Sequence, residues 1–269
     1  MVYRKLDPPQ SLSSLIECFY ILEDHLEQEL VVQSPPNGFC AMVFSIGDVY
    51  SAFQGDQVPR EVPRTFISGQ FTSNYHLVLR GNVEVAGIVF KPSALHNLFG
   101  LRMSTIVNSR MPLEYIVQQD ADNLLRRIQG TNDINERANI LFDFVALRFE
   151  SGHHKPNAAD EAIAIMDLYK GNITVKEVAE KLSVSQRSLE KWFLEKVGIS
   201  PKLYARIKRF SILSNIVAHK KKVDWQEVLF EAGFHDQSHL IKEYLDFNKM
   251  NPADYHQKHH ELVRYIRKD

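Results

Sequence analysis

The sequence predicts an α+β protein, in which a small antiparallel β-barrel with covering helices precedes an all-α part made of two similar helical units joined by a linker helix. Three observations support this class. Short β-type runs alternate with turn residues up to about residue 92, apolar residues then adopt helical spacing, and the C-terminal part contains an internal repeat. The predicted domains are residues 1–150 and 157–269, and the polar segment SGHHKPNAAD links them.

The composition is that of a soluble globular protein, because 44% of the 269 residues are hydrophobic and 24% are charged. The sequence shows neither a signal-type segment nor an apolar stretch of membrane-spanning length. We therefore expect a cytoplasmic protein without a membrane partner. Cys18 and Cys40 stand apart within apolar runs, which predicts buried free thiols and neither a disulfide framework nor a zinc site.

The first predicted domain has β-type runs from about residue 30 to residue 90. Turn segments such as PPNG and QGDQVPR separate runs such as FCAMVFSIGD, TFISGQF, YHLVLRGN and VEVAGIVFKP, which is typical of an antiparallel sheet or small barrel. Aromatic side chains are expected inside it, as packed core or as the lining of a small-molecule site: Phe44, Phe66, Phe71, Tyr75 and Phe90. The pattern does not indicate which residues would bind an effector.

Helical spacing follows from Pro92 onward. The apolar residues that show it are Leu95, Leu98, Phe99, Leu124, Leu125, Ile128, Leu141, Phe142, Val145 and Phe149. They predict helices that cover the sheet as buried core. A homodimer interface formed by residues 113–150 is the alternative interpretation of the same pattern.

The C-terminal part contains one unit twice. With an offset of 50, Val178, Ala179, Leu182, Ser183 and Val184 fall on Val228, Leu229, Ala232, Gly233 and Phe234. After His235 the offset becomes 51, and Ser185, Leu189, Lys191 and Phe193 fall on Asp236, Leu240, Lys242 and Tyr244. A repeat of this length indicates two copies of one structural unit.

Each copy is predicted to be two short helices joined by a tight turn. In the first copy Val178 belongs to an apolar helix face, Ser183 and Val184 form the turn, and Ser185 caps the next helix. The helix that connects the copies begins at Pro201, a residue well tolerated in a first helical turn. This arrangement is a tandem helix-turn-helix.

The second helix of such a unit presents polar side chains that reach base edges in the DNA major groove. We therefore predict base contacts by Ser185, Gln186, Arg187, Ser188, Lys191, Gln237, Ser238 and His239. Phosphate contacts are predicted for Arg206, Lys208, Arg209 and Lys242. Residues 157–269 contain 19 basic and 16 acidic residues against 13 and 17 in residues 1–156, so the positive charge lies in the part predicted to bind a polyanion.

Residues 160–260 resemble the DNA-binding domain of the AraC/XylS transcription regulators in ITVKEVAEKLSVSQRSLEKWF, GISPKLY, EAGFHDQSHLIKEY and NPADY. The resemblance implies a seven-helix domain whose first recognition helix, from Ser185, gives the stronger base readout, while the second, from Asp236, adds base or phosphate contacts. Residues 1–110 resemble, more loosely, the cupin-like sensor domain of some of these regulators in PPNGFCAMVFSIGD, FISGQ and VEVAGIVFKPSAL. That likeness implies effector binding or dimerisation.

Three residues depart from the pattern of the resembling family. Leu229 stands where a small Ala is usual, Lys249 where Gly is usual, and Asn251 where Ser is common. A Leu where two helices approach closely is expected to splay the second unit slightly. Asp236 is expected to serve at least as much as a helix cap as in DNA contact.

These features predict a transcription regulator, more often an activator in the resembling family, that inserts two recognition helices into successive major grooves. Its expected partners are double-stranded DNA, a small-molecule effector, a second copy of the chain and, for an activator, RNA polymerase. No cofactor or metal is expected. The alternative is a protein-interaction module that keeps the tandem fold without specific DNA binding, against which the basic residues Arg187, Lys191, Arg206 and Arg209 argue.

Enzymatic activity is not expected. A metal-dependent cupin enzyme needs clustered ligands, but residues 1–150 contain only the widely separated His25, His76 and His96. A DNA-repair methyltransferase fused to such a domain would need a reactive cysteine and several zinc-binding cysteines, which two isolated cysteines do not supply. The remaining clustered histidines are expected to be solvated: His153, His154, His256, His259 and His260.

Overall fold

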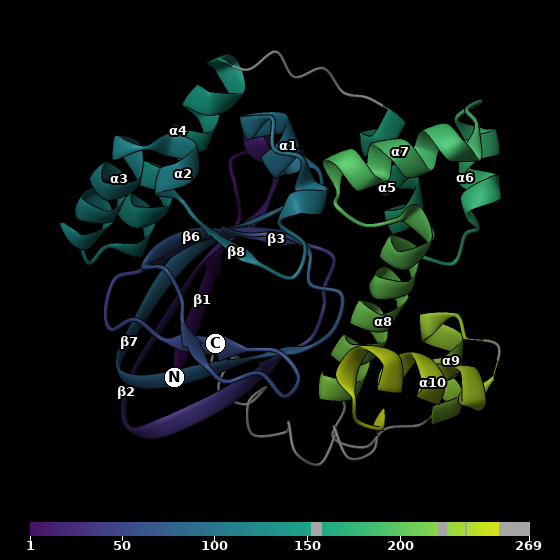
Figure 1. Cartoon of the computed structure of the whole chain (residues 1–269), viewed down its shortest axis with the longest axis horizontal. Helices are drawn as coiled ribbons and strands as arrows, with labels where there is room; N and C mark the ends of the chain where they lie inside the picture. Colours follow the sequence, from purple (N-terminus) through teal and green to yellow (C-terminus); the bar gives the residue numbers. More distant parts are fainter. Residues whose placement is uncertain (152–157, 220–224, 235, 253–269) are drawn as a thin grey trace.

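In the computed structural model, the chain forms a β-rich N-terminal part and a helical C-terminal part (Figure 1). The structure describes residues 1–151, 158–219, 225–234 and 236–252. Most of the predicted linker SGHHKPNAAD therefore lies outside the described residues, and its last three residues already belong to α5 (Ala158–Leu168). The predicted α+β class, with an antiparallel sheet followed by a helical domain, is confirmed.

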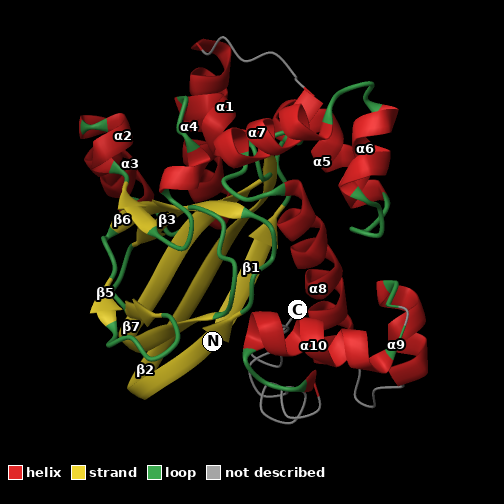
Figure 2. Ribbon diagram, turned by 45° about the vertical axis from the view of Figure 1, so that its right-hand side comes forward, coloured by secondary structure: helices red, strands yellow, loops and turns green. Residues whose placement is uncertain are grey.

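The N-terminal part is a curved antiparallel sheet built on two long strands, β2 (Ile16–Ser34) and β7 (Tyr75–Phe90), which pair along most of their lengths (Figure 2). The strand order is β1-β2-β7-β3-β6-β8, and β4 pairs with both β7 and β5. The shorter strands are β1 (Val2–Leu6), β3 (Cys40–Ser45), β4 (Ser51–Phe53), β5 (Arg60–Glu61), β6 (Thr65–Ser68) and β8 (Arg110–Pro112).

The sheet has two apolar faces because side chains alternate along each strand. Met42 and Phe44 of β3 belong to an outer core shared with the covering helices, whereas Val43 between them belongs to an inner core on the concave face. Of the aromatic residues expected inside the sheet, Phe66 lies in the inner core. Phe44 and Phe90 are packed core as expected, but the expected place inside the sheet was wrong for both, since they pack against the helices on the outer face.

Strand β7 is one continuous element, although the sequence runs YHLVLRGN and VEVAGIVFKP suggested a break at the intervening glycine. Gly81 has a φ of +66°. The backbone N–H of Asn82 donates to the Asp48 carboxylate over 2.9 Å, and the paired strand β2 is irregular between Leu26 and Leu30. Gly81 therefore bends the strand without reversing it, which gives the sheet its curvature.

Helices cover the outer face, as the helical spacing after Pro92 predicted (Figure 1). They are α1 (Ala94–Phe99), α2 (Glu114–Val117), α3 (Gln119–Gln129) and α4 (Ile134–Ser151). Arg137 of α4 is only 2% exposed, and its guanidinium lies 2.8 Å from the Glu84 carboxylate of β7. Its Nε also donates to the carbonyls of Ile128 and Thr131, so one side chain joins α3, α4 and the sheet.

The C-terminal part has its own apolar core, formed by helices α5 to α10. After α5 these are α6 (Val175–Lys181), α7 (Gln186–Lys196), α8 (Pro201–His219), α9 (Trp225–Ala232) and α10 (Gln237–Asn248). The seventh helix implied by the resemblance would fall beyond Pro252, outside the described residues.

Both cysteines are free and buried, as predicted, and burial raises the pKa of the Cys40 thiol to about 12. Among the helices of the described residues, none is long and apolar enough to span a membrane.

Candidate nucleic-acid interface and ligand cavity

The first helix-turn-helix unit consists of α6 and α7. Thr174 caps α6 in a capping box, because its hydroxyl accepts from the Glu177 N–H while the Glu177 carboxylate accepts from the Thr174 N–H. Ser183 in the turn has a φ of +54°, and the Val184 N–H donates to the Ala179 carbonyl over 3.0 Å. The Ser185 hydroxyl then accepts from the Ser188 N–H and caps α7. The cap predicted at Ser185 is therefore present.

The second unit, α9 and α10, repeats this geometry. Gly233 occupies the turn with a φ of +71°, and the Phe234 N–H donates to the Leu229 carbonyl over 2.9 Å. The Asp236 carboxylate accepts from the His239 N–H and caps α10. The same turn hydrogen bond and the same cap position occur in both units, as the sequence repeat predicted.

Most of the predicted base-contacting side chains lie exposed on the two recognition helices. Those with exposed side chains are Ser185, Gln186, Arg187, Lys191, Gln237 and Ser238, whereas Ser188 and His239 are half-buried. The Ser185 and Ser188 hydroxyls are 2.9 Å apart and hydrogen-bond to each other. These two hydroxyls therefore serve the start of α7, while no ion pair with a described residue is formed by Arg187 or Lys191.

The basic residues of the connecting helix α8 have partners inside the protein. Arg206 pairs with the carboxylates of Glu243 and Asp246 at 2.8 and 2.7 Å, which joins α8 to α10. Lys208 lies 3.1 Å from the Asp167 carboxylate, and the Arg209 guanidinium donates to the Gly171 carbonyl. The sequence alone gave no sign of these contacts, because the partners are 37 to 41 positions away. Of the predicted phosphate-contacting residues, Lys242 is exposed.

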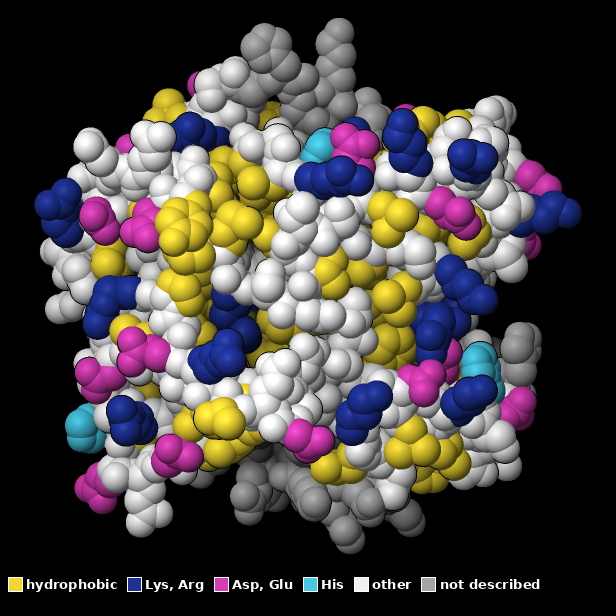
Figure 3. Space-filling model, viewed as in Figure 1, with side chains coloured by type: hydrophobic (Ala, Val, Ile, Leu, Met, Phe, Trp, Pro, Cys, Tyr) yellow, Lys and Arg dark blue, Asp and Glu magenta, His cyan; other side chains and the backbone are white. Residues whose placement is uncertain are grey.

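Lys and Arg side chains gather along the side of the molecule formed by α6 to α10, interspersed with acidic side chains (Figure 3). The charged residues that line the groove beside the first recognition helix are Arg187, Glu190, Lys191 and Glu195 of α7, with His96 and Arg102 from the N-terminal part. A basic residue from the N-terminal part therefore lies next to the predicted base-reading face of α7.

The N-terminal part also contacts the far end of the second recognition helix. The Asn74 backbone N–H donates to the Phe247 carbonyl over 2.8 Å, and its side-chain amide donates to the Asn248 carbonyl over 2.9 Å. Gln33 at the end of β2 donates to the same Asn248 carbonyl. These contacts hold the C-terminus of α10 against the rim of the curved sheet.

The residue that ends α10 provides a stability test. Lys249 has a φ of +58°, a left-handed conformation in which glycine is favoured and in which the resembling family usually has Gly. We expect Lys249→Gly to raise the free energy of unfolding by about 0.5–1 kcal/mol, because the strain of a Cβ is removed. Urea denaturation followed by tryptophan fluorescence measures it, since both tryptophans, Trp192 and Trp225, lie in the helical part.

Lys242→Gly is the matched control for this prediction. Lys242 is exposed in the interior of the same helix, so glycine there should lower stability by about 1 kcal/mol. Stability changes of the same sign in both variants would contradict the assignment of strain to Lys249.

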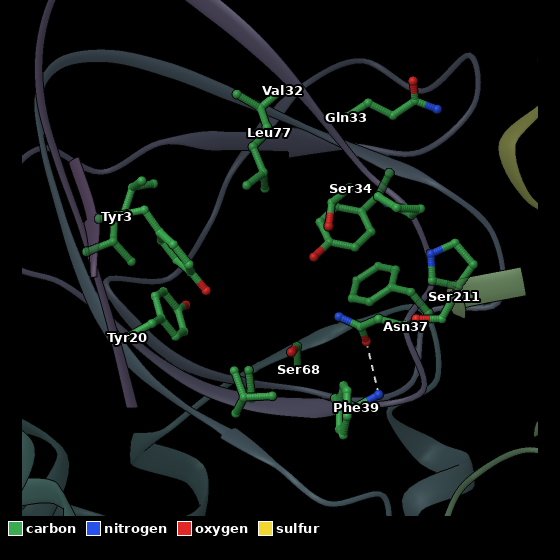
Figure 4. Close-up of a pocket in the computed structure, with 18 of the residues that line it drawn as sticks. Tyr3, Tyr20, Val32, Gln33, Ser34, Asn37, Phe39, Ser68, Leu77 and Ser211 are labelled. Carbon is green, nitrogen blue, oxygen red and sulfur yellow. Dashed lines mark hydrogen bonds between the residues drawn. The ribbon is translucent and has the colours of Figure 1, made fainter. Parts of the chain in front are cut away.

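A cavity of about 440 Å³ lies between the concave face of the sheet and helix α8. Tyr3, Tyr20 and Tyr50 line it from the sheet, as do Phe71 and Tyr75, which the sequence had named as interior aromatics. Ser211 and Ser214 line it from α8. Figure 4 shows the Tyr3 and Tyr20 rings on one side of the open space and Ser34, Asn37 and Ser211 on the other.

The cavity wall is continuous with the contact between the two parts of the chain. Gly38, in the loop after β2, packs directly on α8, since a Cβ added there would lie 3.3 Å from Lys208 and 3.5 Å from Tyr204. The Lys208 ammonium lies 5.1 Å from the ring centroid of Phe39, which lines the cavity. Tyr3 and Tyr20 were not predicted to line a cavity, because β1 and the first half of β2 precede the β-type runs that were recognised in the sequence. Tyr50 lies within the recognised range, between β3 and β4, but was not among the aromatic residues expected inside the sheet.

Among the described residues, no group of three or more His, Cys, Asp and Glu side chains is placed to hold a metal ion. His153, His154, His256, His259 and His260 lie outside these residues.

In comparisons with known protein families, the two parts of the chain match two different families. Residues 4–112 match a domain of unknown function, DUF6597, and residues 178–258 match a helix-turn-helix domain family. No curated protein matches the sequence.

The solved structures that align with this chain share little sequence with it. Apo ToxT from Vibrio cholerae, in a single-substitution form, aligns with a TM-score of 0.49 at 13% identity, covering 90% of this chain and 97% of ToxT. Wild-type ToxT from the same organism bound to an unsaturated fatty acid gives 0.44 at 13% identity, with 87% and 97% covered. The AraC-like transcriptional activator CuxR gives 0.27 at 17% identity, with 77% and 84% covered.

The tandem units, their repeated turn and cap geometry and the two domain matches agree with the motifs found in the sequence. The chain is a DNA-binding transcription regulator with a helix-turn-helix domain matched over residues 178–258, preceded by a DUF6597 domain matched over residues 4–112.

Proposed function

We propose that this regulator binds specific DNA sites by inserting α7 and α10 into successive major grooves, and that a small molecule bound in its N-terminal domain controls this binding. The observation that carries the proposal is the pair of equivalent recognition helices, each capped at its start and joined by one helix. Residues 1–150 would form the sensor domain and residues 157–269 the DNA-binding domain. Dimerisation through residues 113–150, and contact with RNA polymerase if the protein activates transcription, belong to the same proposal.

The length of α8 supports the spacing that two major grooves require. Its 19 residues span about 28 Å at about 1.5 Å per residue. Successive major grooves on one face of B-DNA are about 34 Å apart, so a helix of this length, with a recognition helix near each end, has the right scale. Arg206 contributes by tying α8 to α10 through Glu243 and Asp246, which fixes the orientation of the second recognition helix.

The cavity supports an effector response because its wall includes residues of both domains. A molecule bound there would touch the sheet and α8 together, and α8 carries the two recognition units. The ligand changes DNA affinity if it binds more tightly to one arrangement of the two domains than to another, and if these arrangements differ in their affinity for DNA. Gln33 and Asn74 hydrogen-bond to the end of α10, so the position of the second recognition helix also depends on how the two domains are arranged.

The primary test is selection of genomic fragments by the purified protein, followed by titration of the selected duplex against a scrambled duplex at several salt concentrations. A preferred site with two base-reading patches about one helical turn apart supports the proposal. A single patch means that the second unit only positions the first. No preference for any duplex, with and without candidate effectors, would favour a protein-interaction module.

A pair of substitutions distinguishes base reading from phosphate contact. Arg187→Ala is expected to weaken binding to the selected site by about 1–3 kcal/mol and to relax base preference at one position. Lys242→Ala is expected to weaken all duplexes about equally and to reduce the salt slope by about one. Fluorescence anisotropy with selected and scrambled duplexes measures both effects.

Arg126→Ala is the matched control, because Arg126 is an exposed arginine on α3 of the N-terminal domain. It should leave both duplex affinities unchanged. An equal loss for Arg187→Ala and Lys242→Ala across every duplex would show that the assigned roles of these two residues are wrong.

A further inference from the structure

We propose that the cavity takes an uncharged small molecule with an apolar body and oxygen groups at both ends, one end held by tyrosine hydroxyls of the sheet and the other by hydroxyls of helix α8. This rests on the proposed effector response and specifies the chemistry of the effector. A cavity of about 440 Å³ has the size of a small-molecule site.

Four tyrosines of the N-terminal part offer hydroxyl groups to the cavity, and Tyr75, the register partner of Ser34, lies nearer the α8 side than Tyr3 and Tyr20. Tyr3, Tyr20, Tyr50 and Tyr75 all line the cavity, and the Tyr3 and Tyr20 ring centroids are 5.9 Å apart. Within the described residues, no protein group hydrogen-bonds to any of their hydroxyls. Each hydroxyl is therefore available to a ligand, as donor to a carbonyl or ether oxygen and as acceptor from a hydroxyl.

The walls between the two ends are apolar. They are formed by Leu22, Val32, Leu77, Leu79, Val85 and Val89. Figure 4 shows Val32 and Leu77 between the tyrosine side and the Ser34 side of the open space. An aliphatic or aromatic body would bury its surface against these side chains, while its polar groups reach the two ends.

Few charged groups line the cavity, and none of them is placed to compensate a cationic ligand. Among the described lining side chains only Lys5 is charged; it is exposed, and its ammonium lies 5.4 Å from the Tyr3 ring centroid. The amino group of Met1, also at the cavity, is paired with Asp24 at 2.9 Å. None of the lining residues that the structure describes carries a carboxylate that could hold a cation.

An anion is disfavoured by the surroundings of the tyrosines themselves. Burial raises the pKa of Tyr3, Tyr20 and Tyr50. At Tyr50 the nearby Arg110 guanidinium acts to lower the pKa, but burial has the larger effect and the pKa is raised. Arg110 stacks 4.9 and 4.7 Å from the ring centroids of Phe71 and Tyr75 and does not itself line the cavity. A negatively charged oxygen placed among these hydroxyls would meet the same desolvation.

The other end of the ligand would reach the DNA-binding domain. Ser211 and Ser214 of α8 line the cavity, Ser211 lies opposite Tyr3 and Tyr20 (Figure 4), and Ser214 is only 5% exposed. A ligand oxygen that bonds to these hydroxyls would join the sheet to the helix that carries both recognition units. The residues that line the cavity therefore indicate both the chemical class of the ligand and the helix, α8, through which its binding would affect the recognition units.

Isothermal titration calorimetry of the full chain with three para-hydroxyphenyl probes tests the charge requirement. Methyl para-coumarate is uncharged, para-coumarate carries a carboxylate, and tyramine carries an ammonium at neutral pH. We expect the ester to bind at least about tenfold more tightly than either charged probe, because burial of an uncompensated charge is unfavourable. Equal or tighter binding of a charged probe, or no binding of the ester, overturns the proposal.

Two cavity variants and one control test the location. Tyr20→Phe removes a hydroxyl and keeps the ring, so it should weaken ester binding by about 2- to 10-fold. Ser211→Leu fills the α8 end of the cavity and should weaken binding of the ester by at least as much as Tyr20→Phe does. Tyr115→Phe is the matched control, since Tyr115 is 74% exposed on α2, and it should bind the ester as the unsubstituted chain does. Unchanged affinity in both cavity variants overturns the proposed site.

DNA titrations with the same samples separate this inference from the proposed function. Specific DNA binding without ester binding overturns the ligand class and leaves the proposed regulator in place. Ester binding that follows the expected order, by a folded protein with no duplex preference, supports the ligand class and overturns the proposed function.

Discussion

Phe193→Ala is expected to lower the stability of the DNA-binding domain by about 3–5 kcal/mol and to abolish specific DNA binding near physiological temperature. Phe193 of α7 is fully buried, and its ring centroid lies 5.8 Å from that of Tyr204 on α8. Its removal leaves a cavity where the first recognition helix meets the connecting helix. A loss of this size is a large part of the stability of an ordinary domain, so α7 would no longer be held in a fixed orientation.

Urea denaturation followed by tryptophan fluorescence measures this loss, because Trp192 lies next to Phe193 and Trp225 lies in α9. Leu194→Ala is the matched control: Leu194 is the next residue of α7 but is 47% exposed, so it should change stability by at most about 0.5 kcal/mol. Similar losses in the two variants would mean that α7 does not pack through Phe193.

Arg137→Leu is expected to lower the stability of the N-terminal domain by about 3 kcal/mol. The substitution keeps much of the buried volume but leaves the carbonyls of Ile128 and Thr131 without their donor and Glu84 without its cation. The expected loss of stability is at the lower end of the range for breaking a buried ion pair, because the Glu84 side chain is 23% exposed and can be hydrated once Arg137 is gone.

Circular dichroism during urea denaturation records the unfolding of both domains, whereas tryptophan fluorescence follows only the helical domain, which contains Trp192 and Trp225. A transition seen by circular dichroism alone therefore belongs to the N-terminal domain. Arg148→Leu on the same helix is the control, since Arg148 is 37% exposed and pairs with the half-exposed Asp120. A surface pair of this kind contributes at most about 1 kcal/mol. If Arg137→Leu is no more destabilising than Arg148→Leu, the buried contacts of Arg137 do not hold α4 on the sheet.

The helical domain could be predicted from sequence because its signals are local. Caps at Ser185 and Asp236, the turns at Ser183 and Gly233 and the apolar spacing of α6 to α10 each depend on residues within a few positions of one another. The sheet was harder to predict. The bend at Gly81 depends on Asp48, which is distant in sequence, and the same glycine can end a strand or bend it.

The side-chain roles were predicted less completely than the fold. Arg206, Lys208 and Arg209 were assigned to phosphate from their charge and position, and the structure shows each of them with a partner inside the protein. Such pairings depend on how α8 packs against α5 and α10. Composition shows that a residue is charged but not which group lies beside it in the folded chain.

The sequence by itself determined that the chain carries two linked helix-turn-helix units, because local periodicity, capping residues and a repeat are sufficient to specify them. Only the tertiary structure decided that the sheet encloses a cavity closed by α8, and that Gln33 and Asn74 hold the end of α10. These features join residues as many as 215 positions apart. Their formation depends on the curvature of the sheet and on the docking of one domain against the other, which no short-range pattern encodes.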